Sequence, residues 1–131
     1  LSVRLFEDLL LYFFCIAPVA CRWLPRCDSY LVVEHNGDCY PCDFFVSQRW
    51  RLGNLLRQPL ASIAAGRRRE QFAQQKTKLP ACCTSCPALS FCQGDCPRFR
   101  GPGAGGMPSE YCDSIRRLIQ KLEPIIRGRR T

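Results

Sequence analysis

The chain has 131 residues and a formal charge of +8 at pH 7, and its length allows one domain of ordinary size or two small ones with a modest core. Its eleven cysteines are typical either of a secreted disulfide framework or of thiolates bound to metal. The odd count, the short spacings and the adjacent pair Cys82 and Cys83 argue against disulfides and favour metal.

The first predicted element is a buried apolar helix over Val3–Phe14. The apolar stretch Leu9–Ala20 also has the composition of a signal peptide, but the acidic pair Glu7–Asp8 and the lack of a start methionine argue against one. The stretch covers about a dozen residues, whereas a membrane-spanning helix needs roughly 20. We therefore expect a helix that packs within the protein.

A proline-interrupted stretch, Ala17–Pro25, follows and predicts irregular backbone around the first cysteines of the metal pattern. The segments Tyr30–His35 and Asp38–Tyr40 then flank Asn36-Gly37, which predicts a β-hairpin with a two-residue turn at positive φ. We expect His35, the only histidine, to be a surface residue beside that turn.

Helical spacing returns in the second half of the chain. One helix is predicted from Pro59 towards Lys76, with Arg67–Glu70 facing mostly solvent, and a low-complexity loop follows at Gly101–Gly106. Ser109 can cap a last helix, in whose first turn Cys112 would lie near the positive end of the helix dipole. The apolar stripe predicted for this helix consists of Tyr111, Ile115, Leu118, Ile119, Leu122 and Ile126.

Eight cysteines follow the pattern Cys-x5-Cys-x14-Cys, a gap of forty residues, and Cys-x2-Cys-x5-Cys-x3-Cys-x15-Cys, from Cys21 to Cys112. Soft thiolates select zinc, copper(I) or iron–sulfur clusters. Zinc ribbons usually carry two Cys-x2-Cys knuckles, whereas here one knuckle is followed by wider intervals, as in ferredoxins. The spacing therefore favours two iron–sulfur clusters.

The final cysteine of such a run, when proline follows it, ligates the other cluster in two-cluster ferredoxins, so Cys96 before Pro97 is the predicted crossover ligand. Cys82 could replace Cys83 as a ligand, although the Cys-x2-Cys loop favours Cys83. Two further cysteines, Cys15 and Cys39, are expected to be buried structural residues. The predicted ligands are Cys21, Cys27, Cys42 and Cys96 for cluster one, and Cys83, Cys86, Cys92 and Cys112 for cluster two.

The seven cysteines from Cys27 to Cys112, together with Gly37, resemble the SPASM domain, the C-terminal extension of many radical S-adenosylmethionine enzymes. The additional Cys21 and the strings Tyr40–Phe45 and Trp50–Asn54 are similar to anaerobic sulfatase-maturating enzymes, which oxidise a sulfatase serine or cysteine to formylglycine. The resemblance covers nearly the whole chain.

The resemblance implies two auxiliary [4Fe–4S] clusters that serve electron transfer and complete a substrate pocket, with Asp43 as the catalytic base. It also implies that S-adenosylmethionine and a third cluster belong to an N-terminal radical S-adenosylmethionine barrel. The chain itself lacks the required Cys-x3-Cys-x2-Cys motif, because Phe99 stands where the third cysteine would be. We therefore expect residues 1–20 to be the link to a missing barrel, residues 21–131 to form the twin-cluster domain, and the fragment alone to be inactive.

The expected fold is a small α+β domain in which a short β-hairpin, flanking helices and long cysteine-bearing loops are organised around two metal clusters. Expected partners are the chain's own barrel, a sulfatase polypeptide and a flavodoxin or ferredoxin, in the cytoplasm. Eight bound thiolates would remove about eight positive charges and two cubane clusters would return about four, so the net charge would fall from +8 to about +4. We expect no membrane partner, and nucleic acid is not the expected partner. Two alternatives stay open: a SPASM domain from a peptide-modifying radical enzyme, and a double-zinc module that binds nucleic acid or protein through its arginines.

Overall fold

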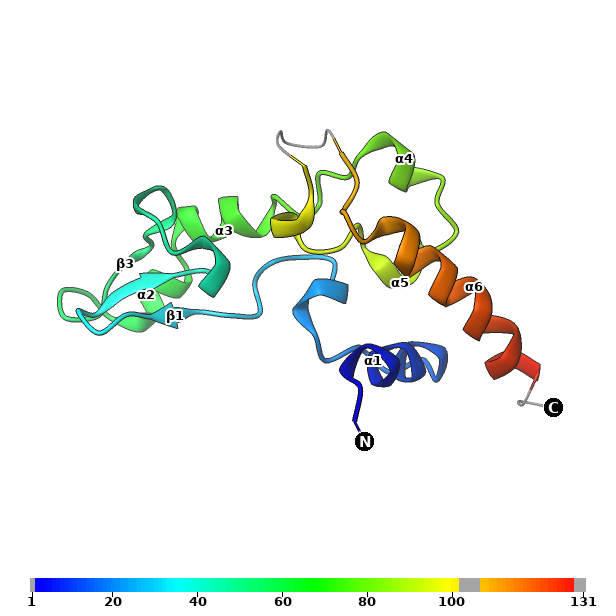
Figure 1. Cartoon of the computed structure of the whole chain (residues 1–131). Coiled ribbons are helices and arrows are strands. Elements are labelled where there is room, and N and C mark those ends of the chain that lie inside the picture. The colour runs from blue at the N-terminus through cyan, green and yellow to red at the C-terminus, as the bar shows by residue number, and fades with distance from the viewer. Residues whose placement is uncertain (1, 102–106, 129–131) are drawn as a thin grey trace. The chain divides into compact units, whose positions relative to one another are not determined.

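The computed structural model describes residues 2–101 and 107–128 and divides into two compact units, Leu1–Leu24 with Leu79–Thr131, and Pro25–Lys78 (Figure 1). The loop predicted at Gly101–Gly106 falls almost entirely outside the described residues. Within the described ranges, no helix combines the length and apolar character needed to cross a membrane. The architecture is a small α+β fold, as predicted.

The first unit is helical and is formed by both ends of the chain. Its elements are α1 (Arg4–Phe13), the short 3-10 helix η1 (Cys21–Trp23), α4 (Ala81–Thr84), α5 (Leu89–Cys92), the 3-10 helix η4 (Pro97–Phe99) and α6 (Cys112–Gly128). Cys21, Cys83 and Cys92 thus lie on short helices, where we had expected loops. Pro97 is the first residue of η4, where its fixed φ suits a first turn and its missing N–H costs nothing, and Pro80 directly precedes α4.

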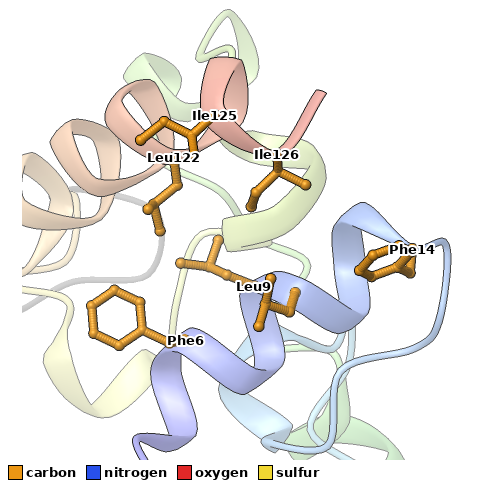
Figure 2. A pocket seen from close by; sticks show the side chains of 7 residues that line it. Phe6, Leu9, Phe14, Leu122, Ile125 and Ile126 are labelled. Carbon is orange, nitrogen blue, oxygen red and sulfur yellow. The ribbon is translucent and has the colours of Figure 1, made fainter. Parts of the chain in front are cut away.

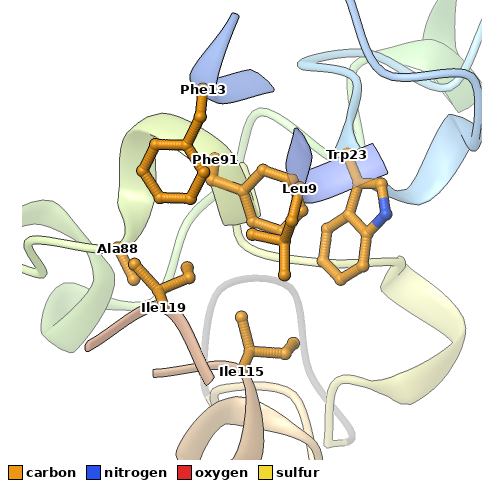
Figure 3. Close-up of a cluster of buried hydrophobic side chains, with 7 residues drawn as sticks. All are labelled: Leu9, Phe13, Trp23, Ala88, Phe91, Ile115 and Ile119. Atoms are coloured by element: carbon orange, nitrogen blue, oxygen red, sulfur yellow. The ribbon is translucent and has the colours of Figure 1, made fainter. Parts of the chain in front are cut away.

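The core of the first unit joins α1, η1, α5 and α6 (Figure 3). Its buried side chains are Leu9, Phe13, Trp23, Ala88, Phe91, Ile115 and Ile119. Phe91 lies at its centre, stacked on Trp23 with ring centroids 4.5 Å apart and edge-on to Tyr12 at 5.3 Å. These contacts fix the segments that carry Cys21 and Cys92.

The helix α1 confirms the predicted helix, but only one of its faces is buried. Cys15, expected to be buried, is exposed just beyond the end of α1, in the left-handed conformation at φ 59°. Phe6, Leu10 and Phe14 are also exposed and line an apolar pocket of about 490 Å³ between α1 and α6 (Figure 2). The other residues of this pocket are Leu9, Leu122, Ile125 and Ile126.

The last helix begins as predicted. Cys112 is its first residue, and the Ser109 hydroxyl accepts a hydrogen bond of 3.1 Å from the Tyr111 N–H. Of the predicted apolar stripe, Ile115 and Ile119 are buried, whereas Tyr111 is 43% exposed.

The second unit contains a three-stranded antiparallel sheet in the order β1-β2-β3. Its elements are β1 (Val32–Val33), β2 (Asp38–Tyr40), the 3-10 helices η2 (Asp43–Phe45) and η3 (Gln48–Trp50), β3 (Gly53–Asn54), α2 (Leu60–Ala64) and α3 (Arg67–Ala73). Val32 pairs with Tyr40, and Asp38 pairs with Asn54. The strand β3 was not predicted, because a glycine and an asparagine carry no strand signal.

The hairpin is confirmed, but its turn differs from the predicted one. The Glu34 N–H donates to the Asp38 carbonyl, and the Gly37 N–H donates to the Glu34 carbonyl, so the loop has three residues with His35 exposed in it. Gly37 has a φ of 82°, whereas Asn36 does not adopt a positive φ. A three-residue loop with a left-handed glycine at its end is the next most common hairpin connection.

The helix predicted from Pro59 is interrupted. Gly66 has extended backbone and separates α2 from α3, because glycine favours such breaks. Ile63 and Phe72 point into the unit, and Phe72 meets Phe45 and Trp50 edge-on at 5.1 Å. Arg69 was expected to face solvent, but its guanidinium donates to backbone carbonyls of the same unit, so it has a structural role.

Candidate metal centres

The four predicted ligands of cluster two all belong to the first unit. Cys83 lies on α4, Cys86 follows that helix, Cys92 ends α5 and Cys112 begins α6. Local backbone turns place the first two, since the Cys83 N–H donates to the Pro80 carbonyl at 2.9 Å and the Cys86 N–H donates to the Cys83 carbonyl at 3.1 Å. All four are thiols without a disulfide.

Each of three thiols in this group is affected electrostatically by others of the group. Burial, followed by the neighbouring Cys82 and then Cys112, raises the pKa of Cys83 to about 11. Burial, followed by Asp95, also raises the pKa of Cys92 to about 11, with smaller effects of Cys112 and Cys83. Burial and then Cys86 raise the pKa of Cys112. The four sulfurs therefore lie within electrostatic reach of one another in a region of reduced hydration.

Within residues 2–101 and 107–128, no three histidine, cysteine or acidic side chains converge closely enough to hold one metal ion. A tetrahedral zinc site would require four sulfurs at about 2.3 Å from a single atom. In a four-iron cluster each cysteine binds a different iron, so its sulfurs are spread more widely. Four thiols are donors that either kind of site uses.

The side chain of Cys83 is buried, whereas that of adjacent Cys82 is exposed. This supports Cys83 as the ligand, as the Cys-x2-Cys spacing had favoured. Cys39 is buried in β2 and its thiol donates to the Gly37 carbonyl at 3.6 Å, so the prediction that it is structural is confirmed.

The predicted ligands of cluster one are divided between the two units. Cys21 opens η1 and buried Cys96 precedes η4 in the first unit, while Cys27 and Cys42 belong to the second. The Cys27 N–H donates to the Ala73 carbonyl at 3.5 Å. The grouping of these four cysteines stays a prediction.

Asp43, the predicted base, directly follows Cys42 and opens η2. Its Oδ1 accepts hydrogen bonds from the Cys42 thiol at 3.3 Å and the Phe44 N–H at 3.2 Å. The carboxylate is exposed, so it is held in place beside a predicted ligand and can still be approached.

Sequence reasoning missed a polar network that connects the cysteine-bearing segments of the first unit. The Asp95 carboxylate, fully buried, accepts two hydrogen bonds of 2.8 Å from Arg22 and one of 2.6 Å from Ser109. Asp8, 1% exposed, accepts bonds from Val19, Ala20 and Trp23. The available signal was an acidic residue in an otherwise apolar or glycine-rich setting, namely Asp8 among leucines and Asp95 between Gly94 and Cys96.

Comparisons with known proteins show the family to which this sequence is similar. The family model SPASM, described as an iron-sulfur cluster-binding domain, matches residues 21–87. The serine-type anaerobic sulfatase-maturating enzyme of Bacteroides thetaiotaomicron is 33% identical over 126 residues, which are 93% of this chain and 30% of that protein. The cysteine-type enzyme of Clostridium perfringens is 31% identical over 125 residues, which are 94% of this chain and 34% of that protein.

Solved structures of anSMEcpe with bound AdoMet share the fold. One has a TM-score of 0.87 and 27% identity, and the match covers 98% of this chain and 36% of that chain. A second, which also holds the Kp18Cys peptide, gives the same values. The chain thus spans about a third of the length of these relatives. With the family model matching half of its residues, the chain belongs to the SPASM family of iron–sulfur cluster-binding domains.

Proposed function

We propose that this chain is the auxiliary iron–sulfur part of an anaerobic sulfatase-maturase-like radical S-adenosylmethionine enzyme, which oxidises a sulfatase serine or cysteine to formylglycine. The observation that carries the proposal is the SPASM match together with the fold shared, at a TM-score of 0.87, with a solved structure of anSMEcpe. The relatives named above are sulfatase-maturating enzymes over nearly the whole of this sequence.

The chain would hold two [4Fe–4S] clusters. Cys83, Cys86, Cys92 and Cys112 would bind one, and Cys21, Cys27, Cys42 and Cys96 the other. Bound clusters of this kind supply one-electron transfer. The protein's own contribution is to keep the thiols in a poorly hydrated region and to release their protons when metal binds, since the raised pKa values of Cys83 and Cys92 keep them protonated in the metal-free chain.

Asp43 would act as the general base. The hydrogen bond that Oδ1 accepts from the Phe44 N–H fixes the orientation of the exposed carboxylate, and it persists when Cys42 loses its proton to bind metal. A substrate serine or cysteine that docks there would give its side-chain proton to Asp43, while the hydrogen atom and the electron lost from its Cβ would go to the radical chemistry of the barrel and to the clusters. Because Asp43 directly follows Cys42, this proton transfer would occur next to a predicted cluster ligand.

The remaining components would come from outside the chain. S-adenosylmethionine and a third cluster would belong to an N-terminal radical S-adenosylmethionine barrel, with residues 1–20 as the link to it. A sulfatase polypeptide would be the substrate, and a flavodoxin or ferredoxin the electron partner, in the cytoplasm.

The first test is metal analysis of the anaerobically reconstituted chain. We expect about eight irons and eight acid-labile sulfides per chain, with visible absorption that dithionite bleaches. A colourless protein with stoichiometric zinc would contradict the proposal and support the double-zinc alternative.

The second test replaces Asp43 by Asn in a full-length enzyme that contains this domain. We expect formylglycine formation to fall by about 100-fold or more, with iron content unchanged, because a general base contributes about 10²- to 10⁴-fold. Asp28→Asn is the matched control, since Asp28 likewise follows a predicted ligand, Cys27, and should leave the rate unchanged. Full activity of the Asp43→Asn enzyme would remove the assigned base and favour another radical-enzyme class.

A further inference from the structure

The loop between Cys92 and Cys96 has an unusual backbone. All three of its residues are left-handed, with φ values of 49° at Gln93, 71° at Gly94 and 59° at Asp95. Residues other than glycine rarely adopt this conformation, and they retain it only where the surroundings enforce it. The turn is closed by the Asp95 N–H, which donates to the Cys92 carbonyl at 2.7 Å.

Arg100 enforces the conformation from one side. Its Nε donates to the Gly94 carbonyl at 2.7 Å, and its Nη2 donates to the carbonyls of Asp95 at 3.1 Å and Gln93 at 3.4 Å. A single guanidinium thus binds the carbonyls of all three left-handed residues. A Cβ at Gly94 would lie 2.4 Å from the Leu79 Cδ2 and 2.5 Å from the Arg100 Nη2, so both side chains pack against the hydrogen face of this glycine.

The Asp95 side chain enforces the conformation from the other side and reaches two more cysteine segments. Arg22, which binds both of its oxygens, directly follows Cys21. Ser109, which donates to its Oδ2, accepts the Cys112 N–H on its backbone carbonyl at 2.9 Å. Because consecutive Cα atoms are about 3.8 Å apart, these bonds restrain Cys21, Cys96 and the start of α6 together.

Arg22 is itself held by aromatic rings. Its guanidinium carbon lies 4.5 Å from the ring centroid of Trp23, 5.4 Å from that of Phe99 and 5.6 Å from that of Tyr111. Cation–π contacts at these distances fix the plane of the guanidinium. Arg22 also neutralises the charge of Asp95, so the network adds no net charge beside the thiolates.

We propose that Asp95 is a positioning residue for the clusters: through Arg22 and Ser109 it prearranges Cys21, Cys96 and Cys112 before metal binds. The inference rests on the proposed function, because it takes these cysteines as ligands. Residues that hold metal ligands in this way typically change metal affinity by about 10- to 100-fold when they are removed.

The test compares Asp95→Asn with the unsubstituted chain after anaerobic reconstitution. Asparagine has nearly the same shape and tolerates the left-handed conformation, so the substitution removes the charge without forcing the loop open. We expect iron release to a chelator about 10- to 100-fold faster, together with an altered electron paramagnetic resonance spectrum of the reduced protein.

Asp38→Asn is the matched control. It breaks the pair Arg51–Asp38, whose arginine is 32% exposed against 31% for Arg22, but which does not adjoin a predicted ligand. We expect this variant to destabilise the metal-free chain without changing iron release. Release at the unsubstituted rate from Asp95→Asn, or equal acceleration in both variants, would overturn the inference.

If circular dichroism shows that Asp95→Asn does not fold, the rate of iron release is measured on Ser109→Ala instead, because this substitution removes one hydroxyl only. Faster release from Ser109→Ala supports the inference, and an unchanged rate overturns it. An unsubstituted chain that takes up no iron would instead contradict the proposed function, so the two failures are distinguishable.

Discussion

The two units use their buried groups differently. The first has an apolar core of helix side chains and, around it, the fully hydrogen-bonded carboxylates Asp8 and Asp95. The second has a small sheet, buried Ile63 and Phe72, and an ion pair, Arg51–Asp38, that is partly exposed.

The first unit restrains its side chains through buried polar groups, whereas the second exposes some of its side chains to solvent. The first unit restrains its cysteines through buried polar groups, which are costly unless every partner is satisfied and which therefore define one arrangement. The second unit places Asp43 and Phe44 on an exposed segment that begins at η2. Under the proposed function, the first unit would hold six of the eight predicted ligands, and the second would supply Cys27, Cys42 and the exposed Asp43.

The largest expected effect concerns the two cores. Phe91→Ala should lower the free energy of unfolding of the first unit by about 3–5 kcal/mol, because it leaves a cavity where Trp23 and Tyr12 now pack. Hydrogen exchange of the metal-free chain should quicken in α1 and α6.

Phe72→Ala is the counterpart in the second unit and should quicken exchange in residues 25–78 instead. If either substitution accelerates exchange equally throughout the described residues, the two units unfold as one and the comparison fails.

A smaller effect is expected from Asp8→Asn. The carboxylate accepts three N–H donors, and an amide nitrogen facing the Trp23 indole N–H would place two donors together. We expect a loss of about 2 kcal/mol in urea unfolding. Glu7→Gln, at the exposed neighbouring position, is the control and should change stability by less than about 0.5 kcal/mol. Equal effects would show that burial of Asp8 has no energetic consequence.

The smallest expected effect is on the stability of the second unit at low pH. A hydrogen bond from Arg51, and then one from Asn54, holds the pKa of Asp38 below its ordinary value. A depressed carboxyl pKa contributes stability above the unfolded-state pKa, and this contribution is lost as pH falls through the folded-state pKa. The second unit should therefore lose stability below about pH 4, and Asp38→Asn should reduce that slope in thermal melts. An unchanged slope would contradict the assignment.

Sequence patterns correctly predicted those structural features that depend on interactions between residues close in sequence. The helix α1, the left-handed Gly37 and the start of α6 at Cys112 each depend on residues close in sequence, so periodicity and turn chemistry were sufficient. The break at Gly66 was missed because the apolar spacing of the predicted helix continues across it, and a single glycine is a weak signal within such a pattern.

The polar network was not predictable in the same way. Arg22 and Asp95 are 73 residues apart, so no window of sequence contains both. The left-handed conformation at Gln93 likewise depends on Arg100, seven residues away, and contradicts the local preference of glutamine. The cysteine spacing predicts the ligands, whereas the groups that restrain the cysteine-bearing segments depend on tertiary structure.

The first unit is discontinuous in sequence, and this affects how the protein is made. A ribosome delivers α1 and η1 first, then all of residues 25–78, and only afterwards α5 and α6. Synthesis proceeds at about 5–20 residues per second. Leu9, Phe13 and Trp23 are therefore made on the order of ten seconds before the core residues of α5 and α6 that bury them. The nascent chain therefore exposes an aggregation-prone apolar surface during that interval. The yield of folded protein in cells should depend on chaperones that cover this surface.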